Sequence, residues 1–206
     1  MAKIKICGLF RECDITAVNE AQPDYAGFII DFPKSHRNVT PGEAAALRKL
    51  LAPGIKAVGV FVNRPAEAVA EAAKLIGLDI IQRHVDEDEA YIEKVRDLSK
   101  KPVWKAFKIR NGADIKAAAL SSADEVLLDN GYGTGEAFDW SAVGDFKRPF
   151  ILAGGLNALN IKEAIGTLAP DIVDVSSGVE TDKLKDAEKI RLCVDEVRSC
   201  CEPGNC

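Results

Sequence analysis

The chain has 206 residues, of which 47% are hydrophobic and 29% are charged, and its formal net charge is −5 at pH 7. We therefore expect one globular domain over residues 1–206, with a flexible tail at about 202–206. The acidic balance, without a visible basic stripe, argues against nucleic acid as the main partner. No apolar run reaches transmembrane length, so we expect a cytoplasmic protein with no membrane partner.

Short apolar strands alternate with helical segments along the first half of the chain. The strands are expected at residues 3–7, 25–30, 56–62 and 79–82. The helices that follow them are expected at residues 14–21, from Pro41, from Pro65, and from about 86 to 101. The connection of residues 31–40 is longer than the others and carries Lys34, His36 and Arg37.

The same alternation continues through the second half. Strands are expected at residues 102–109 and 124–129, separated by a helix at 111–120 and followed by a glycine-rich loop at 130–136. Two more apolar runs, around residues 149–153 and 171–175, give the seventh and eighth strands, and a last helix is expected from about 182 to 201. The strands are apolar throughout instead of alternating with polar residues, which is typical of parallel strands buried on both faces. The fold predicted is a single, parallel eight-stranded (β/α)₈ TIM barrel of the α/β class.

An open, doubly wound sheet is the structural alternative. Such a sheet usually carries a dinucleotide-binding fingerprint after its first strand. The residues at that place, Gly8-Leu9-Phe10-Arg11, do not form one. The barrel is therefore the fold that we favour.

The last two strands each end abruptly in small residues. Gly154-Gly155 follow the seventh strand, and Ser177-Gly178 follow the eighth. Glycine lets a backbone approach a ligand closely, and barrel enzymes bind phosphate in these two loops. Two ordinary tight turns are the alternative for either loop alone, but the tandem arrangement favours a phosphate site.

Polar residues at the other strand ends would line the same mouth of a barrel. In chain order, this ring consists of Cys7, Arg37, Asn63, Gln82 with His84, Lys105 and Asp129. Asp174 and Asn157, close to the phosphate loops, are expected to support loops or cap a helix.

Six cysteines lack paired C-x-x-C spacing: Cys7, Cys13, Cys193, Cys200, Cys201 and Cys206. A domain of this length needs no disulfide staples. The last three lie at the C-terminal end, where a metal clip is an alternative to the free thiols that we favour.

Several of these segments together resemble one family, phosphoribosylanthranilate isomerase of tryptophan biosynthesis. The matching segments, in the order of the family, are Lys5-Ile6-Cys7-Gly8, Gly59–Asn63, Leu127–Asp129 before Gly133–Gly135, Phe138–Trp140, Leu152–Leu156 and Asp174–Glu180. The resemblance extends from Lys3 to about Val197, and the motifs taken together are specific.

The resemblance implies an Amadori rearrangement of N-(5-phosphoribosyl)anthranilate to 1-(2-carboxyphenylamino)-1-deoxyribulose 5-phosphate, with no cofactor and no metal. It implies that Cys7 is the general base, that Asp129 is the general acid, and that Arg37 binds the carboxylate of the anthranilate ring. The expected partner is this small phosphosugar, and association with other tryptophan-pathway enzymes stays open.

The chemistry sets its own requirements on these residues. A thiol acts as a base only as thiolate, so we expect Cys7 in a partly exposed, electropositive setting. Asp129 must hold a proton near neutral pH, which requires burial or a nearby negative charge. A buried apolar cysteine and a turn-forming aspartate are the alternatives for these two positions, and a solvated loop arginine is the alternative for Arg37.

The chain departs from the family in two places. The family's fourth strand usually ends Gln-Leu-His-Gly, whereas this chain has Gln82-Arg83-His84-Val85. Gln82 and His84 are therefore additional site candidates whose roles stay open. The loop at residues 130–135 is shorter than in many members and carries Tyr132 where glycine is common, so its closure over the substrate also stays open.

Two other functions are weighed against this one. The related sugar isomerase of histidine biosynthesis uses a carboxylate where this chain has Cys7, and it has a second phosphate-binding half that this chain lacks. A catalytically silent phosphosugar-binding barrel is the alternative from a different class. The presence of both Cys7 and Asp129 argues against it.

Overall fold

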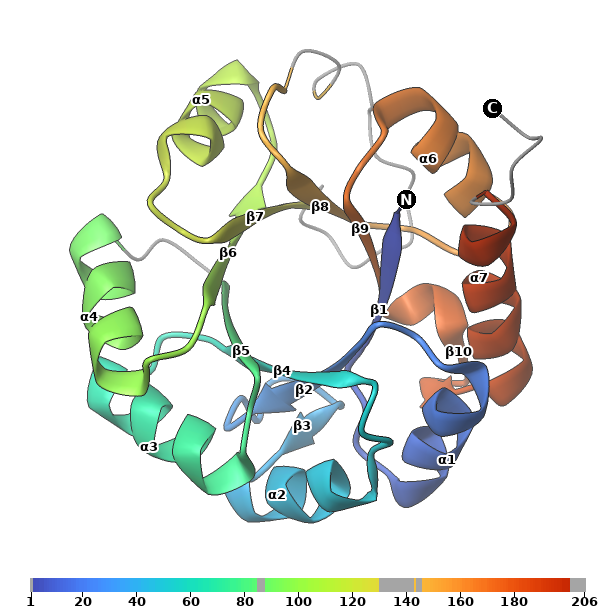
Figure 1. The fold of residues 1–206 in the computed structure, drawn as a ribbon, viewed down its shortest axis with the longest axis horizontal. Helices are drawn as coiled ribbons and strands as arrows, with labels where there is room; N and C mark the ends of the chain where they lie inside the picture. Colours follow the sequence, from blue (N-terminus) through green and yellow to red (C-terminus); the bar gives the residue numbers. More distant parts are fainter. Residues whose placement is uncertain (1, 85–87, 130–142, 144–145, 201–206) are drawn as a thin grey trace.

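The computed structural model describes residues 2–84, 88–129, 143 and 146–200. Eight parallel strands close into a barrel, viewed down its axis in Figure 1, because the last of them, β9, pairs with β1 and β1 also pairs with β2. These strands are β1 (Lys3–Cys7), β2 (Tyr25–Ile30), β4 (Lys56–Phe61), β5 (Ile80–His84), β6 (Val103–Lys108), β7 (Glu125–Asp129), β8 (Phe150–Ala153) and β9 (Ile172–Val175). The predicted TIM barrel is confirmed.

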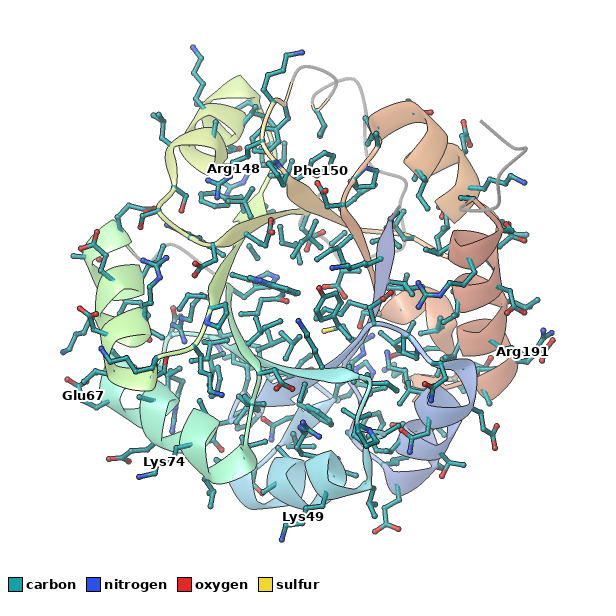
Figure 2. The ribbon with its side chains drawn as sticks, viewed as in Figure 1. Lys49, Glu67, Lys74, Arg148, Phe150 and Arg191 are labelled. Carbon is teal, nitrogen blue, oxygen red and sulfur yellow. The ribbon has the colours of Figure 1, made fainter. Side chains whose placement is uncertain are left out.

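Helices form the outer layer around the barrel (Figure 1). Those in the described residues are α1 (Glu12–Ala21), α2 (Pro41–Leu50), α3 (Ala66–Ile76), α4 (Glu89–Ser99), α5 (Gly112–Leu120), α6 (Ile161–Leu168) and α7 (Ala187–Ser199). Their outer faces carry charged side chains that point away from the barrel in Figure 2, such as Lys49, Lys74 and Arg191. In the described part of the chain, no helix is long and apolar enough to cross a membrane.

The last helix begins later than the sequence predicts. Helix α7 starts at Ala187 instead of about 182, and the preceding residues form a small antiparallel hairpin of β10 (Glu180–Thr181) and β11 (Leu184–Lys185). Asp182 and Lys183, at the tip, have left-handed φ angles of 51° and 64°. Asp186 then caps the helix, because its carboxylate accepts hydrogen bonds from the N–H groups of Glu188 and Lys189.

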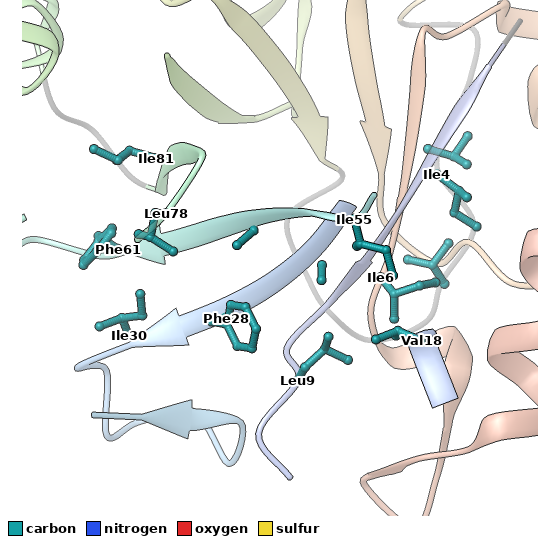
Figure 3. Close-up of a cluster of buried hydrophobic side chains, with 14 of the residues drawn as sticks. Ile4, Ile6, Leu9, Val18, Phe28, Ile30, Ile55, Phe61, Leu78 and Ile81 are labelled. Atoms are coloured by element: carbon teal, nitrogen blue, oxygen red, sulfur yellow. The ribbon is translucent and has the colours of Figure 1, made fainter. Parts of the chain in front are cut away.

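Two buried layers explain why the strands are apolar on both faces. Side chains on one face fill the barrel interior, where the rings of Tyr25 and Trp104, from β2 and β6, meet edge to face with centroids 5.1 Å apart. Side chains on the other face form a second buried cluster together with helix side chains such as Val18, and Figure 3 shows part of it with Ile6, Phe28 and Ile81. Because each strand is buried on both sides, hydrophobic runs replace the alternating pattern of a half-exposed strand.

Four aspartates repeat one brace at the end of the barrel where the strands begin. Each stands immediately before a strand and accepts a hydrogen bond from a backbone N–H near the start of the preceding barrel strand. The pairs are Asp24 with Ile4 (2.9 Å), Asp79 with Ala57 (2.8 Å), Asp124 with Val103 (2.8 Å) and Asp171 with Phe150 (3.2 Å). These hydrogen bonds therefore join the barrel strands in pairs at the end where the strands begin. The opposite end of the barrel, where the strands finish, is free of these bracing contacts.

Replacing Asp79 with alanine should lower the free energy of unfolding by about 1–3 kcal/mol, because the buried N–H of Ala57 loses its acceptor. Asp79→Asn should lose less, because the amide oxygen still accepts this bond. Asp195→Ala, which removes an exposed partner of Arg191, should stay within about 0.5 kcal/mol of the parent. Urea denaturation measures all three, and an Asp79→Ala variant as stable as Asp195→Ala would contradict the brace.

Candidate active site

A cavity of about 190 Å³ opens at the end of the barrel where the strands finish. Its walls include most of the predicted site residues: Cys7, Arg37, Gln82, His84, Asp129, Gly154, Gly155 and Ser177. A larger cavity of about 670 Å³ lies at the opposite end, over Tyr25, Trp104 and three of the bracing aspartates. We take the smaller cavity as the candidate site, because it lies at the carboxyl ends of the strands and brings Cys7, His84 and Asp129 together with the glycines after β8.

Cys7 ends β1 and lies in the wall of this cavity, but its side chain is buried. The neighbouring residue on β2 is Gly27, where a Cβ atom would lie 2.9 Å from the Cys7 sulfur, so glycine gives the thiol room. Burial raises the pKa of the Cys7 thiol, and the positive charge of Lys5 opposes this rise. The expectation of a partly exposed thiol is therefore wrong, whereas the expected electropositive group is present.

Lys5 and Asp174 form a buried ion pair beside Cys7. The Lys5 ammonium lies 2.8 Å from a carboxylate oxygen of Asp174 on β9, and Lys5 is completely buried. Burial lowers the pKa of Lys5, but Asp174 and Cys7 outweigh that effect and raise it, so Lys5 keeps its charge. The expectation that Asp174 supports a loop is wrong, since it is a strand residue in the cavity wall. The two-residue spacing from Lys5 to Cys7 puts both on one face of β1 and is a signal that the sequence contained.

Asp129 and His84 lie together on the cavity wall. Asp129 ends β7, and its carboxylate lies 3.8 Å from Nε2 of His84 at the end of β5. Gln82, two residues before His84, is buried and faces the same cavity. The predicted glycine-rich loop with Tyr132, and Val85 after His84, lie outside the described residues.

Arg37 reaches the cavity from the loop between β2 and the short strand β3 (Asn38–Val39). Its guanidinium makes two hydrogen bonds to Glu180 on β10, at 2.5 and 2.7 Å. The predicted arginine is therefore at the site, but it is held by a carboxylate that sequence reasoning missed. The two residues are 143 positions apart in the chain, and no local pattern joins them.

The two predicted phosphate loops are in direct contact. Gly154 and Gly155 adopt left-handed φ angles of 98° and 66° after β8, a conformation that favours glycine. Gly178 lies in the short 3₁₀ helix η2 (Ser177–Val179) after β9, and a Cβ atom there would collide with the carbonyl oxygen of Leu156. Asn157 supports the loop before α6, as expected, because its side-chain oxygen accepts a hydrogen bond from the N–H of Leu159 at 2.9 Å, whereas Asn160 is the N-cap of the helix.

Two residues of the predicted ring do not line the cavity. Lys105 lies on the outer face of β6, where its ammonium is 3.0 Å from Glu89 of α4. Asn63 follows β4 in a left-handed conformation with φ of 50° and is not part of the cavity wall. The sequence placed Lys105 near the mouth, but the alternation of the strand turns its side chain towards the helices.

Comparisons with known proteins agree on one family. The family model of N-(5'phosphoribosyl)anthranilate (PRA) isomerase matches residues 4–196. The N-(5'-phosphoribosyl)anthranilate isomerase of Caldanaerobacter subterraneus is 45% identical over 205 residues, which cover 96% of this chain and 98% of the relative. The corresponding protein of Acetivibrio thermocellus is 43% identical, with 96% of each chain covered.

Solved structures give the same result. The phosphoribosyl anthranilate isomerase of Thermotoga maritima superimposes with a TM-score of 0.88 at 33% identity, covering 97% of this chain and all (100%) of that one. A phosphoribosyl anthranilate isomerase in complex with reduced 1-(o-carboxyphenylamino)-1-deoxyribulose 5-phosphate superimposes with a TM-score of 0.86 at 32% identity, with 97% and 100% covered. The chain therefore belongs to the phosphoribosylanthranilate isomerase family, and it is an isomerase of tryptophan biosynthesis.

Proposed function

We propose that the chain converts N-(5-phosphoribosyl)anthranilate to 1-(2-carboxyphenylamino)-1-deoxyribulose 5-phosphate by an Amadori rearrangement, with Cys7 as general base and Asp129 as general acid. The arrangement of groups around the cavity carries this proposal. The phosphate loops follow β8 and β9, which lie between β7 with Asp129 and β1 with Cys7. A sugar whose phosphate binds these loops is flanked by a carboxyl group on one side and a thiol on the other.

The proposed reaction needs one acid and one base. Asp129 gives a proton to the ribose ring oxygen, the bond from this oxygen to C1 breaks, and the opened sugar becomes a protonated Schiff base. Cys7 removes the proton from C2, which gives an enolamine. Addition of a proton at C1 and loss of the proton from the C2 hydroxyl then yield the ketone, so that substrate and product are isomers. Gly154, Gly155, Ser177 and Gly178 bind the phosphate, and Arg37 binds the ring carboxylate in this scheme.

Two buried acceptors support a hydroxyl-bearing substrate. Oε1 of Gln82 and Oδ1 of Asp174 are buried, and neither has a hydrogen-bond partner within the described part of the chain. Buried polar atoms in proteins are normally paired, and the exceptions commonly mark functional sites. Both atoms accept hydrogen bonds, whereas the sugar offers hydroxyl donors, so a bound phosphosugar satisfies them.

The environment of Cys7 predicts how kcat/KM depends on pH. The base must be deprotonated and burial raises the pKa of the thiol, so kcat/KM should increase as pH rises into the alkaline range. Lys5→Met removes the charge that favours the thiolate, so the increase should move to higher pH. Timed alkylation of Cys7 by iodoacetamide across the same pH range reads the thiolate directly. An unchanged pH profile in a folded Lys5→Met variant would contradict this role of Lys5.

The activity itself is tested by anthranilate fluorescence. Adding the purified chain to freshly prepared N-(5-phosphoribosyl)anthranilate should abolish the substrate's fluorescence and yield an isomer of equal mass. Release of free anthranilate would indicate hydrolysis of the substrate instead. Unchanged substrate, or release of anthranilate as the only enzymatic result, would contradict the proposed reaction.

A further inference from the structure

The guanidinium of Arg37 is fixed on one edge by Glu180. Nε and Nη2 of Arg37 donate to the two carboxylate oxygens of Glu180 at 2.5 and 2.7 Å, which is a bidentate pair. The Glu180 side chain is only 7% exposed and that of Arg37 only 19% exposed. A paired fork of this kind is held in one orientation better than a free arginine, which must lose rotamer freedom when it binds a ligand.

Glu180 is itself held by the hairpin that contains it. The buried ammonium of Lys185 donates to Glu180 at 2.8 Å and to the backbone carbonyl of Ser176 at 2.8 Å. Lys189 donates to the backbone carbonyl of Glu180, also at 2.8 Å. Burial opposes ionisation of Glu180, but the hydrogen bonds from Arg37 and Lys185 prevail and lower the pKa of this carboxyl to about 2.

The side chain of Arg37 packs against the backbone of Gly8. A Cβ atom at Gly8 would collide with Cδ of Arg37, so the arginine stem lies directly against this backbone. In the described part of the chain, Nη1 of Arg37 makes no hydrogen bond to the protein. The Nη1–Nη2 end is thus the part of the fork left for a ligand, and Arg37 forms part of the cavity wall.

Cations outnumber the carboxylate that they share in this cluster. Arg37 and Lys185 both pair with the carboxylate of Glu180, and Lys189 donates to the backbone carbonyl of the same residue. His36 also lies beside Glu180, with its Nε2 3.6 Å from the carboxylate. This excess of cations favours a further carboxylate, which matches the planar end of the guanidinium.

We propose that Glu180 is a positioning residue that makes the site selective for a substrate with a carboxylate on its aromatic ring. Glu180 occupies one edge of Arg37 and leaves the Nη1–Nη2 end for that carboxylate. This inference rests on the proposed function, because it assigns Arg37 to the anthranilate end of the substrate. Glu180 contributes through Arg37 and takes no part in the proton transfers.

A double-mutant cycle with two ligands tests this inference. The ligands are reduced 1-(o-carboxyphenylamino)-1-deoxyribulose 5-phosphate and the same compound without its carboxylate, and calorimetry measures Kd for each. Glu180→Ala should weaken binding of the first ligand by roughly tenfold or more while changing the second little. Glu180→Gln should lie between Glu180→Ala and the parent, because an amide oxygen still accepts one hydrogen bond from Arg37.

The double variant distinguishes a positioning role from an independent one. If Glu180 works through Arg37, the variant with both residues changed to alanine should lose no more carboxylate preference than Arg37→Ala alone. Glu188→Ala, which breaks an exposed pair with Arg191, should leave both affinities unchanged. Additive losses, equal weakening of both ligands in Glu180→Ala, or tighter binding of the carboxylate ligand would each overturn the inference.

Binding measurements also separate this inference from the proposed function. The double-mutant cycle measures carboxylate recognition by binding alone, without turnover. If substitutions at Cys7 and Asp129 leave turnover intact while the cycle gives the expected result, the proposed mechanism fails and the role of Glu180 stands. If substitutions at Cys7 and Asp129 abolish turnover but the Glu180→Ala variant still prefers the ligand with the carboxylate as strongly as the parent does, only the role of Glu180 fails.

Discussion

Asp129→Asn should slow turnover by roughly 10²–10⁴-fold, the usual contribution of a positioned general acid, with little change in substrate binding. Asparagine has nearly the same size as aspartic acid but has no carboxylic acid proton to give to the ribose ring oxygen. The measurement is steady-state turnover by loss of anthranilate fluorescence, with Kd for the reduced product analogue measured separately.

The same strand offers a matched control for this change. Asp124 stands immediately before β7, at the opposite end of the barrel, and Asp124→Asn keeps an acceptor for the N–H of Val103. This control should turn over at close to the parent rate. Near-normal turnover of Asp129→Asn would remove Asp129 from the mechanism. A loss in His84→Gln instead would move the acid to His84, which lies 3.8 Å from Asp129.

Cys7→Ser should reduce turnover by about 10²-fold or more. A hydroxyl is far too weak an acid to be ionised near neutral pH, so serine is a poor base at this position. Cys13→Ser is the matched control, because Cys13 is exposed on α1, and it should leave turnover unchanged. Kinetics of both variants, measured beside the parent, give the comparison.

Alkylation by iodoacetamide tests the role of Cys7 independently of substitution. Iodoacetamide should inactivate the chain in step with modification of Cys7, and the bound product analogue should slow both. Exposed Cys13 should react faster without loss of activity, whereas Cys201 and Cys206 lie outside the described residues. A fully active Cys7→Ser variant that is still inactivated by alkylation of another cysteine would place the base elsewhere.

The barrel was predictable because its signals are local. Each strand is a short apolar run, and helix starts are marked by residues such as Pro41 and Asn111, which is the N-cap of α5. The loop after β8 was equally readable, since Gly154 and Gly155 stand directly after an apolar run. These features depend on a few neighbouring residues and not on distant contacts.

The parts that could not be predicted depend on contacts between distant residues. Glu180 meets Arg37 across 143 residues, and Asp174 meets Lys5 across 169, so neither pair leaves a local pattern. The hairpin before α7 was missed because Lys183 stands at the second turn position, where a turn with two left-handed residues usually has glycine. Burial of Cys7 was missed because Gly27, which makes room for the sulfur, lies on the neighbouring strand.

The central claim, that Cys7 removes the proton from C2 of the sugar, is tested most directly by a kinetic isotope effect. The measurement is the ratio of kcat/KM for substrate with hydrogen and with deuterium at C2, in the parent, Cys7→Ser and Asp129→Asn. Loss of the base slows the C2 step, so the isotope effect should increase in Cys7→Ser. Loss of the acid slows ring opening instead, so the effect should not increase in Asp129→Asn. An isotope effect in Cys7→Ser no larger than in the parent, together with an increase in Asp129→Asn, would contradict the assignment of Cys7 as the base.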